Sequence, residues 1–389
     1  MGSELTPIHT CGACPVCASG DIRTFFELAD IPVNVCVQWH SREKAIACPR
    51  GDIKLASCKG CGFIWNSVFD ASKLDYTQAY ENSLFFSPRF QDFSNSLVRR
   101  LIDRYGLTNK QVIEIGCGKG DFLRLFCTMG NNRGIGFDTS YEGGADDERI
   151  TVIRDFYSKK YANYGGDLVC SRYVFEHIDK PAVFLNDIRR IIGDNGSIVY
   201  FEVPNVSLIL RNLSIWDVIY EHCSYFGIES LSYIFKLCGF TILDVYESYE
   251  GQFVGIEARP SDKNGNIKSD AGKVASDVES FVHNYLKQLE LWQNKLEAIE
   301  NAGKKVVVWG AGAKGVSFLN MLKLGEKIEY IVDINPRKHG KYIAGTGQKI
   351  VSPDFLSGYN PDFVILPNPI YRDEVGKTIK ALGVDAEIL

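Results

Sequence analysis

The sequence lacks long apolar runs, an excess of basic residues and a secretory signal. No stretch of its 389 residues is apolar for long enough to cross a bilayer. Acidic residues (48) outnumber basic ones (43), so the net charge of -5 offers no surface suited to nucleic acid. The segment from Met1 to Thr6 has neither the basic nor the apolar part of a signal peptide. We therefore expect a cytoplasmic protein that binds neither a membrane nor a nucleic acid.

Histidine is scarce, with six residues, whereas cysteine is abundant, with twelve, and seven of these fall in the first 61 residues. Without a secretory signal, such crowding favours metal binding over disulfides. The N-terminal cysteines include two C-x-x-C pairs, which are Cys14 with Cys17 and Cys58 with Cys61. Four thiolates form the closed tetrahedral site of structural Zn²⁺, which leaves no position open for catalysis.

The spacing of the two pairs leaves some alternatives open. It exceeds that of typical zinc ribbons, so we expect residues 18–57 to form an inserted loop. Cys11 lies near the first pair and can replace one ligand. The competing interpretation is a set of reduced structural thiols with no metal.

A glycine-rich turn follows the first strong strand pattern, Gln111–Ile115. The turn contains Gly116, Gly118 and Gly120 and opens a helix. Glycines let the backbone turn tightly and approach a ligand, and a helix N-terminus presents free N–H groups. Glu114 at the strand end suits the charged amino-acid half of S-adenosylmethionine rather than a pyrophosphate.

Acids also end the strands that follow. Asp138 can accept the two ribose hydroxyls, as the acid of a dinucleotide fold does. Asp155 and Phe156 can hold the adenine by a hydrogen bond and an apolar contact. Glu176 and His177 follow the fourth strand, where the methyl donor would lie. We therefore predict an S-adenosylmethionine site, against the alternative of a purely structural glycine turn.

The stretch from Gln111 to Ala258 resembles the class I methyltransferase family. Its alternating strands and helices predict an α/β fold with a mainly parallel sheet. The resemblance implies a seven-stranded Rossmann-like sheet whose seventh strand is antiparallel, which fits a closing hairpin at Phe240–Tyr246 and Phe253–Ala258. Tyr80, Ser83 and Ser87 can form a lid over the donor pocket.

A second Glu-His pair, Glu221 and His222, follows the fifth strand. In this sheet order the segment lies over the carboxyl ends of the strands, where ligands bind. Histidine suits general-base catalysis near neutral pH, and an adjacent acid can orient it. Tyr220 can donate a hydrogen bond to a substrate oxygen. A hydrogen-bonded structural histidine is the alternative.

A true G-x-G-x-x-G stands near the C-terminus, formed by Gly310, Gly312 and Gly315. With Asp333 after the next strand, it is typical of dinucleotide binding, whereas Lys314 can instead meet a phosphate. The remaining alternative is a turn that only packs helix against strand. Whether this loop binds a nucleotide stays open at this point.

The chain as a whole resembles the three-domain sugar C-methyltransferases of deoxysugar biosynthesis. The motifs that carry the likeness are the paired C-x-x-C, the Gly116–Gly120 loop, Glu221–Phe226, Gly312–Gly315 with Leu319 and Asn320, and Val332–Tyr342. The resemblance implies that a histidine removes the proton beside the keto group of a nucleotide-linked 4-keto-6-deoxy sugar, and that the enolate takes the methyl group. His222 matches that base and Glu221 its acidic neighbour.

One departure from that pattern concerns Tyr220. The family commonly has Tyr-x-Glu-His, whereas here Tyr220 directly precedes Glu221. This departure puts the role of Tyr220 and the identity of the sugar in doubt. The resemblance also implies that the C-terminal domain serves the substrate rather than NAD.

These expectations combine into one architecture and one activity. We expect a zinc-binding domain (1–75), a methyltransferase domain with lid helices (76–259), a linker near 260–272 and a C-terminal Rossmann-like domain (273–389). The predicted cofactors are S-adenosylmethionine and structural Zn²⁺, the predicted substrate is a nucleotide-linked keto-deoxysugar, and the chain is expected to be a monomer or weak homodimer. The alternatives are O- or N-methylation of another metabolite or natural-product intermediate, and a zinc-bearing binding protein without activity.

Overall fold

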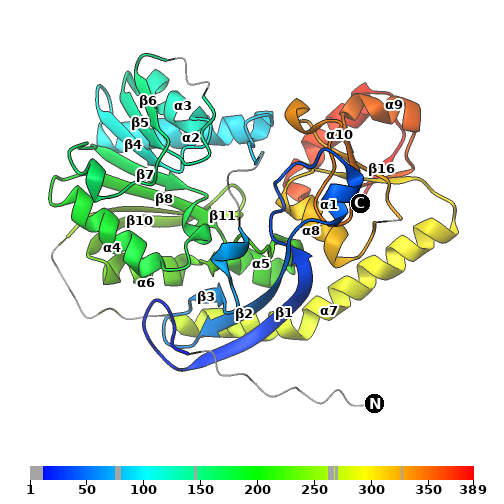
Figure 1. Cartoon of the computed structure of the whole chain (residues 1–389), viewed down its shortest axis with the longest axis horizontal. Coiled ribbons are helices and arrows are strands. Elements are labelled where there is room, and N and C mark those ends of the chain that lie inside the picture. The colour runs from blue at the N-terminus through cyan, green and yellow to red at the C-terminus, as the bar shows by residue number, and fades with distance from the viewer. Residues whose placement is uncertain (1–11, 75–79, 144–146, 262–266, 268–269, 326) are drawn as a thin grey trace.

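The computed structural model describes residues 12–74, 80–143, 147–261, 267, 270–325 and 327–389. These residues form three parts, built on a four-stranded, a seven-stranded and a five-stranded sheet. Figure 1 shows the seven-stranded sheet on the left, the five-stranded sheet on the right, and the N-terminal strands with the long helix α7 (Ala271–Asn301) below them. Within the described ranges no helix combines the length and the apolarity that a membrane crossing needs.

The central sheet has the strand order β10-β11-β8-β7-β4-β5-β6. Its parallel strands are β4 (Gln111–Ile115), β5 (Arg133–Phe137), β6 (Ile150–Ile153), β7 (Leu168–Arg172) and β8 (Ile198–Pro204). β11 (Phe253–Pro260) runs antiparallel between β8 and β10 (Phe240–Ser248). The predicted class I methyltransferase sheet with an antiparallel seventh strand is therefore confirmed.

Amphipathic helices cover both faces of this sheet. α2 (Pro88–Tyr105) and α3 (Asp121–Gly130) bury Leu97, Val98 and Phe122 against one face. α4 (Pro181–Ile192) and α6 (Ile228–Leu237) bury Leu185 and Leu231 against the other. The side chain of Ser87 caps α2 by accepting from the Phe90 N–H, and Gly106 ends the helix in the left-handed region. The carboxyl ends of the parallel strands are left open for ligands.

The N-terminal part corrects one expectation. Residues 18–57 do not form an inserted loop, because they contain β1 (Ile22–Pro32), the short helix α1 (Arg42–Ile46) and most of β2 (Arg50–Cys58). β1 and β2 pair antiparallel, and β3 (Ile64–Asn66) extends the sheet. Ile53 and Leu55 alternate with more exposed Asp52 and Lys54 along β2, so one face of the strand is buried.

The C-terminal part is a second Rossmann-like unit, as predicted. Its parallel sheet has the order β14-β13-β12-β15-β16. The strands are β12 (Val306–Trp309), β13 (Tyr330–Val332), β14 (Lys349–Val351), β15 (Phe363–Ile365) and β16 (Glu387–Ile388). The helices are α8 (Ala313–Met321), α9 (Leu356–Tyr359) and α10 (Arg372–Ala381).

Two elements join the three parts across the boundaries expected from the sequence. β9 (Ser224–Tyr225) follows the fifth strand of the central sheet yet pairs with β3 as the fourth strand of the N-terminal sheet. α7 packs Phe281 against Phe25 and Phe26 of β1 and continues to the C-terminal domain. Because one apolar core runs through these contacts, the domain limits at 75, 76, 259 and 273 stay predictions.

Candidate functional site

A single cavity of about 770 Å³ lies where the central and C-terminal parts face each other. Both glycine-rich turns contribute to its lining, as do His177, His222 and the residues expected to form a lid, Tyr80, Ser83 and Ser87. Direct contacts hold the walls together: Lys314 Nζ lies 2.8 Å from Asp217 Oδ2, and Trp216 Nε1 donates to the Pro367 carbonyl over 2.9 Å.

The first glycine turn has the backbone geometry that its sequence predicts. Gly116, Gly118 and Gly120 all have positive φ values, of 73°, 52° and 78°. A Cβ on Gly116 would lie 2.1 Å from Val174 Cγ2, so only glycine fits there. The Gly118 N–H donates to Asp138 Oδ2 over 2.8 Å, which ties the turn to the end of β5. Asp138 Oδ1 also accepts from the backbone and hydroxyl of Ser140.

Glu114 lies at the end of β4 with its side chain buried and part of the cavity lining. Its Oε2 has no hydrogen-bond partner among the described residues. Burial raises the pKa of this carboxyl to about 8, although the Arg172 guanidinium opposes the shift. A cationic group placed in the cavity would pair with the free oxygen and favour the ionised form.

We expect Glu114→Gln to weaken binding of S-adenosylhomocysteine while leaving the fold intact. The substitution keeps the shape of the side chain but removes the negative charge that we expect to meet the ammonium. The loss of a hydrogen bond to a charged group is worth about 1.5–3 kcal/mol, or roughly 10- to 100-fold in Kd. Calorimetric titration checks this, with Glu290→Gln on the exposed side of α7 as the matched control. Equal affinities in the two variants would contradict the assignment.

Asp155 and Phe156 lie on the open side of the cavity. Asp155 accepts from the Tyr161 hydroxyl over 2.6 Å and pairs with Lys160 over 3.0 Å, and these contacts lower its pKa to about 2. The Phe156 side chain is 75% exposed. An exposed aromatic ring at the mouth of a cavity is available to cover a flat apolar ligand.

The structure brings the adjacent residues Glu176 and His177 together with His222, which lies far from both in the sequence. A carboxylate oxygen of Glu176 and one nitrogen of each imidazole all lie within 4.8 Å of one another. The imidazole rings meet edge to face with centroids 5.0 Å apart. Burial lowers the pKa of His177 to about 4, and burial together with His177 holds the pKa of His222 well below its usual value. Both imidazoles are therefore neutral at pH 7, as a base must be.

Glu221, predicted as the acid beside the base, faces away from the cavity. Its Oε1 accepts from the Val35 N–H over 2.8 Å, and burial raises its pKa to about 8. Its backbone carbonyl, rather than its carboxyl, contacts the histidine pair, through His177 Nδ1 at 3.0 Å. The carboxyl that lies beside His222 is that of Glu176. The sequence could not show this, because residues that are adjacent in the chain need not direct their side chains to the same place. Here the side chains of Glu221 and His222 point in different directions.

Tyr220 also points to the N-terminal sheet and does not line the cavity. Its ring lies against Gly51, where a Cβ would approach Cε2 to 2.4 Å. Its hydroxyl accepts from the Asp70 N–H over 3.1 Å and donates to the Asp70 carbonyl over 3.3 Å. Ile219, two positions before Glu221, lines the cavity at the place where the family pattern commonly has tyrosine.

These contacts make Tyr220→Phe a test of the predicted catalytic role. If the hydroxyl serves only Asp70, the substitution lowers the free energy of unfolding by about 1 kcal/mol and leaves kcat within about twofold. Chemical denaturation and turnover measured on one preparation check both quantities. A large fall in kcat at unchanged stability would place the hydroxyl in contact with substrate.

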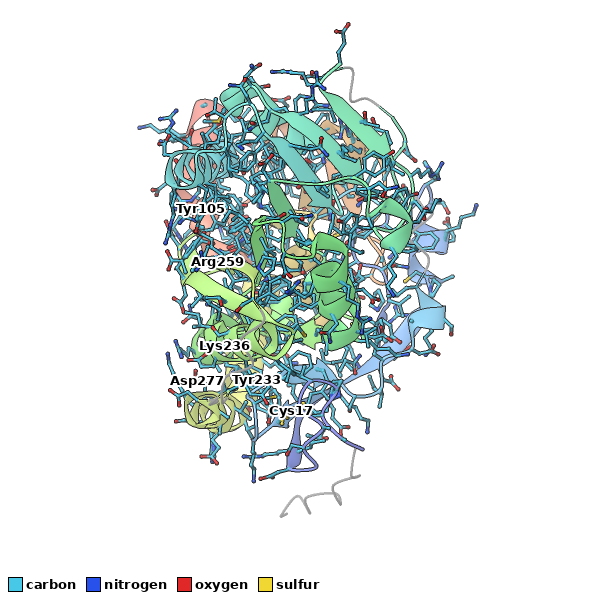
Figure 2. All side chains as sticks on the ribbon, turned by 90° about the vertical axis from the view of Figure 1, so that its left-hand side faces the viewer. Cys17, Tyr105, Tyr233, Lys236, Arg259 and Asp277 are labelled. Carbon is cyan, nitrogen blue, oxygen red and sulfur yellow. The ribbon has the colours of Figure 1, made fainter. Side chains whose placement is uncertain are left out.

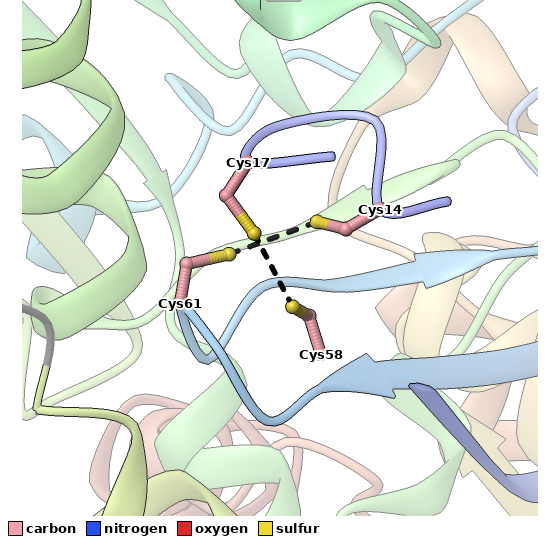
Figure 3. A group of neighbouring side chains, drawn as sticks. All are labelled: Cys14, Cys17, Cys58 and Cys61. Carbon is pink, nitrogen blue, oxygen red and sulfur yellow. Dashed lines mark hydrogen bonds between the residues drawn. The ribbon is translucent and has the colours of Figure 1, made fainter. Parts of the chain in front are cut away.

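Four cysteines converge at the end of the N-terminal sheet where β1 begins and β2 ends (Figure 3). Cys14 Sγ lies 3.7 Å from Cys61 Sγ, and Cys17 Sγ lies 3.5 Å from Cys58 Sγ. All four sulfurs lie within 4.8 Å of one another and form no disulfide. Tetrahedral Zn–S bonds of about 2.3 Å require sulfurs about 3.8 Å apart, so the donor set fits this ion. Cys11 lies outside the described residues.

The cysteine cluster packs against the methyltransferase part. Figure 2 shows Cys17 beside Tyr233, which α6 contributes from below the central sheet. Burial and the nearby thiols raise the pKa of Tyr233. Cys58, Cys61 and Phe63 belong to the same apolar core as Phe226, so the four-cysteine end of the N-terminal part supports the segment that carries His222.

At the second glycine turn, the acid at the strand end is Asp333, and its carboxylate already accepts hydrogen bonds from the protein itself. Asp333 Oδ2 accepts from the Ala311 N–H over 2.8 Å and from Lys338 Nζ over 3.0 Å, and Oδ1 accepts from the Asn335 N–H. A Cβ on Gly315 would lie 1.9 Å from the Gly310 carbonyl oxygen, so this glycine serves close packing of helix on strand. An NAD ribose would compete with a buried Lys338 for the carboxylate.

Glu81 makes contacts at the cavity that the spacing of residues in the sequence could not have predicted. The buried Glu81 accepts from Lys119 Nζ over 2.7 Å and from Asn335 Nδ2 over 3.0 Å. Lys119 belongs to the first glycine turn and Asn335 to the C-terminal domain. Glu81 therefore links the two sides of the cavity, and these contacts hold its pKa below the usual value despite its burial.

Comparison with known proteins agrees with this geometry. A methyltransferase-domain family model matches residues 90–245, and a C-methyltransferase C-terminal-domain model matches residues 275–384. The C-methyltransferase NovU of Streptomyces niveus is 26% identical over 301 residues, which cover 72% of this chain and 71% of NovU.

Solved structures of similar proteins include two methyltransferases with bound S-adenosylhomocysteine. The magnesium protoporphyrin IX methyltransferase of Synechocystis PCC 6803 is 17% identical, with a TM-score of 0.35, over 44% of this chain and 84% of its own. The 1,6-didemethyltoxoflavin-N1-methyltransferase of Burkholderia thailandensis is 13% identical, with a TM-score of 0.34, over 45% and 82%.

The strand order, the glycine turn and the two family models define the chain as an S-adenosylmethionine-dependent methyltransferase. Because the second of these models describes the C-terminal domain of C-methyltransferases, the two models together describe, more particularly, a multi-domain C-methyltransferase.

Proposed function

We propose that the chain transfers a methyl group to the carbon beside the ketone of a nucleotide-linked keto-deoxysugar, with His222 as the base. The observation that carries the proposal is one shared cavity, whose lining includes the first glycine turn, His222 and the C-terminal glycine turn. A methyl donor alone does not need the last of these. An elongated acceptor with an anionic diphosphate would use the C-terminal glycine turn, because free N–H groups at the start of α8 favour anions.

The donor site follows from the acids at the strand ends. In this proposal Glu114 meets the ammonium of S-adenosylmethionine, Asp138 the ribose hydroxyls, and Asp155 with Phe156 the adenine. When bound, the cofactor supplies an electrophilic methyl group on its sulfonium. The unpartnered Oε2 of Glu114 supports the first contact, because a buried oxygen without a partner is costly unless a ligand completes it.

His222 performs the proton transfer in this account. Its neutral imidazole takes the proton from the carbon next to the ketone, and the electron pair left on that carbon forms the new bond to the methyl group. S-adenosylhomocysteine leaves with the pair of the broken carbon–sulfur bond. Glu176 and His177 border the base and hold it in a dry part of the cavity, where desolvation keeps it unprotonated. Glu221, through its carbonyl, orients His177.

The Zn²⁺ proposed for the four cysteines has a structural role. Four thiolates leave no position open for substrate, and the cluster lies outside the residues that line the cavity. Its contribution to catalysis is the support of the N-terminal sheet, which β9 completes directly after His222.

Product analysis tests the proposed acceptor. The chain is incubated with ¹³C-methyl-labelled S-adenosylmethionine and a nucleotide-linked 4-keto-6-deoxy sugar, and the product is examined by mass spectrometry and NMR. The proposal predicts one added methyl group, bonded to the carbon next to the former ketone. Methylation at oxygen or nitrogen, or turnover only with acceptors that lack a ketone, would contradict it.

A further inference from the structure

Glu176 is a buried carboxyl with an unsatisfied oxygen. It is the middle residue of the short helix η3 (Phe175–His177), which follows β7, and only 2% of its surface is exposed. Its Oε2 has no hydrogen-bond partner among the described residues. Burial raises its pKa to about 8, and Glu202 adds to the shift. A buried polar atom of this kind calls for a partner that the protein itself does not supply.

Two imidazoles surround this carboxyl. One ligand atom each from Glu176, His177 and His222 lies within 4.8 Å of the others. Zn–N bonds of about 2.0–2.1 Å require ligand atoms roughly 3.4 Å apart, so modest side-chain rotation brings the three onto one ion. All three side chains line the cavity, so an ion held by them keeps at least one position open to the cavity.

Hydrogen bonds fix the two segments that carry these side chains. His177 Nδ1 lies 3.0 Å from the Glu221 carbonyl, which can only accept, so Nδ1 carries the proton and Nε2 the lone pair. Cys223 Sγ lies 3.6 Å from the Glu176 carbonyl, and the Ser224 hydroxyl donates to the Ile178 carbonyl over 2.7 Å. A backbone carbonyl that orients an imidazole is the usual outer partner of a metal-binding histidine.

The donor set decides which ions fit. Two imidazoles and one carboxylate suit borderline ions such as Zn²⁺ and Co²⁺, whereas Mg²⁺ and Ca²⁺ prefer oxygen ligands alone. The cluster also differs from the four-cysteine site in having no thiolate and an open face. The two sites are therefore distinguishable by the spectrum of a bound Co²⁺ ion.

We propose that Glu176, His177 and His222 form a second metal site, in the cavity, and that Zn²⁺ bound there inhibits the enzyme by occupying the base. A lone pair of His222 that coordinates the ion cannot take a proton from substrate. The binding itself does not depend on the proposed sugar chemistry, whereas the inhibition rests on His222 as the base. The two parts therefore have separate tests.

Cobalt titration tests the binding. The full chain is first loaded with one Zn²⁺, then titrated with Co²⁺ without substrate, and followed by calorimetry and visible absorption. We expect one further equivalent with nitrogen and oxygen ligand-field bands and no sulfur charge-transfer band. In Glu176→Gln and in His177→Ala the affinity falls by about 100-fold or more. His283→Ala, which changes an exposed histidine on α7, binds Co²⁺ as the native chain does.

Two results would overturn the site. One is no second equivalent of Co²⁺ on the folded native chain, and the other is unchanged affinity in the folded Glu176→Gln variant. Turnover tests the inhibition: Zn²⁺ should lower kcat reversibly, with a midpoint at the Kd of the second site and recovery on chelation. Stimulation by Zn²⁺, or no effect at saturation, would refute the inhibition. If His222 is not the base, the cobalt titration still reports the site.

Discussion

Replacing His222 with asparagine should lower kcat by about 10²- to 10⁴-fold, the range that a positioned general base contributes. Asparagine retains a polar group of similar reach but cannot accept the proton from carbon. The native imidazole is suited to this step because burial and His177 hold its pKa well below the usual value, so it is unprotonated at pH 7. Binding of S-adenosylhomocysteine should stay within about twofold, since the donor contacts are assigned to Glu114 and Asp138.

The measurement pairs steady-state turnover with calorimetric titration of S-adenosylhomocysteine on the same preparations. His283→Asn on α7 is the matched control, because it changes the same residue type at an exposed position. The account fails if the His222 variant keeps more than a tenth of the native rate. A parallel loss of donor binding would show instead that the substitution disturbs the pocket as a whole.

Cys58→Ser should destabilise the chain by more than about 4 kcal/mol, because it removes one thiolate of the proposed zinc site. Cys58 ends β2, and its sulfur lies 3.5 Å from that of Cys17. Loss of the ion releases the N-terminal sheet, to which β9 belongs. Since β9 begins two residues after His222, turnover should fall with stability.

Cys238→Ser provides the matched control for this prediction. The Cys238 thiol donates weakly to the Ala182 carbonyl over 3.6 Å, and a serine hydroxyl can make the same contact. We therefore expect a cost of about 1 kcal/mol and the same zinc content as the native protein. Chemical denaturation and metal analysis measure both quantities. Equal stability of the two variants would show that the four cysteines do not hold an ion that supports the fold.

Much of the fold follows from local sequence patterns. The strand at Gln111–Ile115 has the expected bounds, because it is a short apolar run that ends in a glycine turn. The two C-x-x-C pairs converge, as their spacing predicts. The bounds of a strand depend on neighbours in the chain, for which sequence periodicity is informative.

What the sequence could not show depends on contacts between distant segments. β9 belongs to the central part by position yet completes the N-terminal sheet, since strand pairing is decided by the tertiary fold. The partner of His222 is Glu176 rather than the adjacent Glu221, whose carboxyl instead accepts from the Val35 N–H of the N-terminal part. Glu81 meets Lys119 and Asn335, which lie 38 and 254 residues away.

The most direct test of the account is hydrogen exchange at the acceptor carbon. A nucleotide-linked 4-keto-6-deoxy sugar is incubated in D₂O with the chain and S-adenosylhomocysteine, so that enolate forms but no methyl group is transferred. The account predicts that NMR shows deuterium entering beside the ketone with the native chain and not with His222→Asn. Exchange at equal rates in both, or methyl transfer by a native chain that never exchanges this proton, would contradict it.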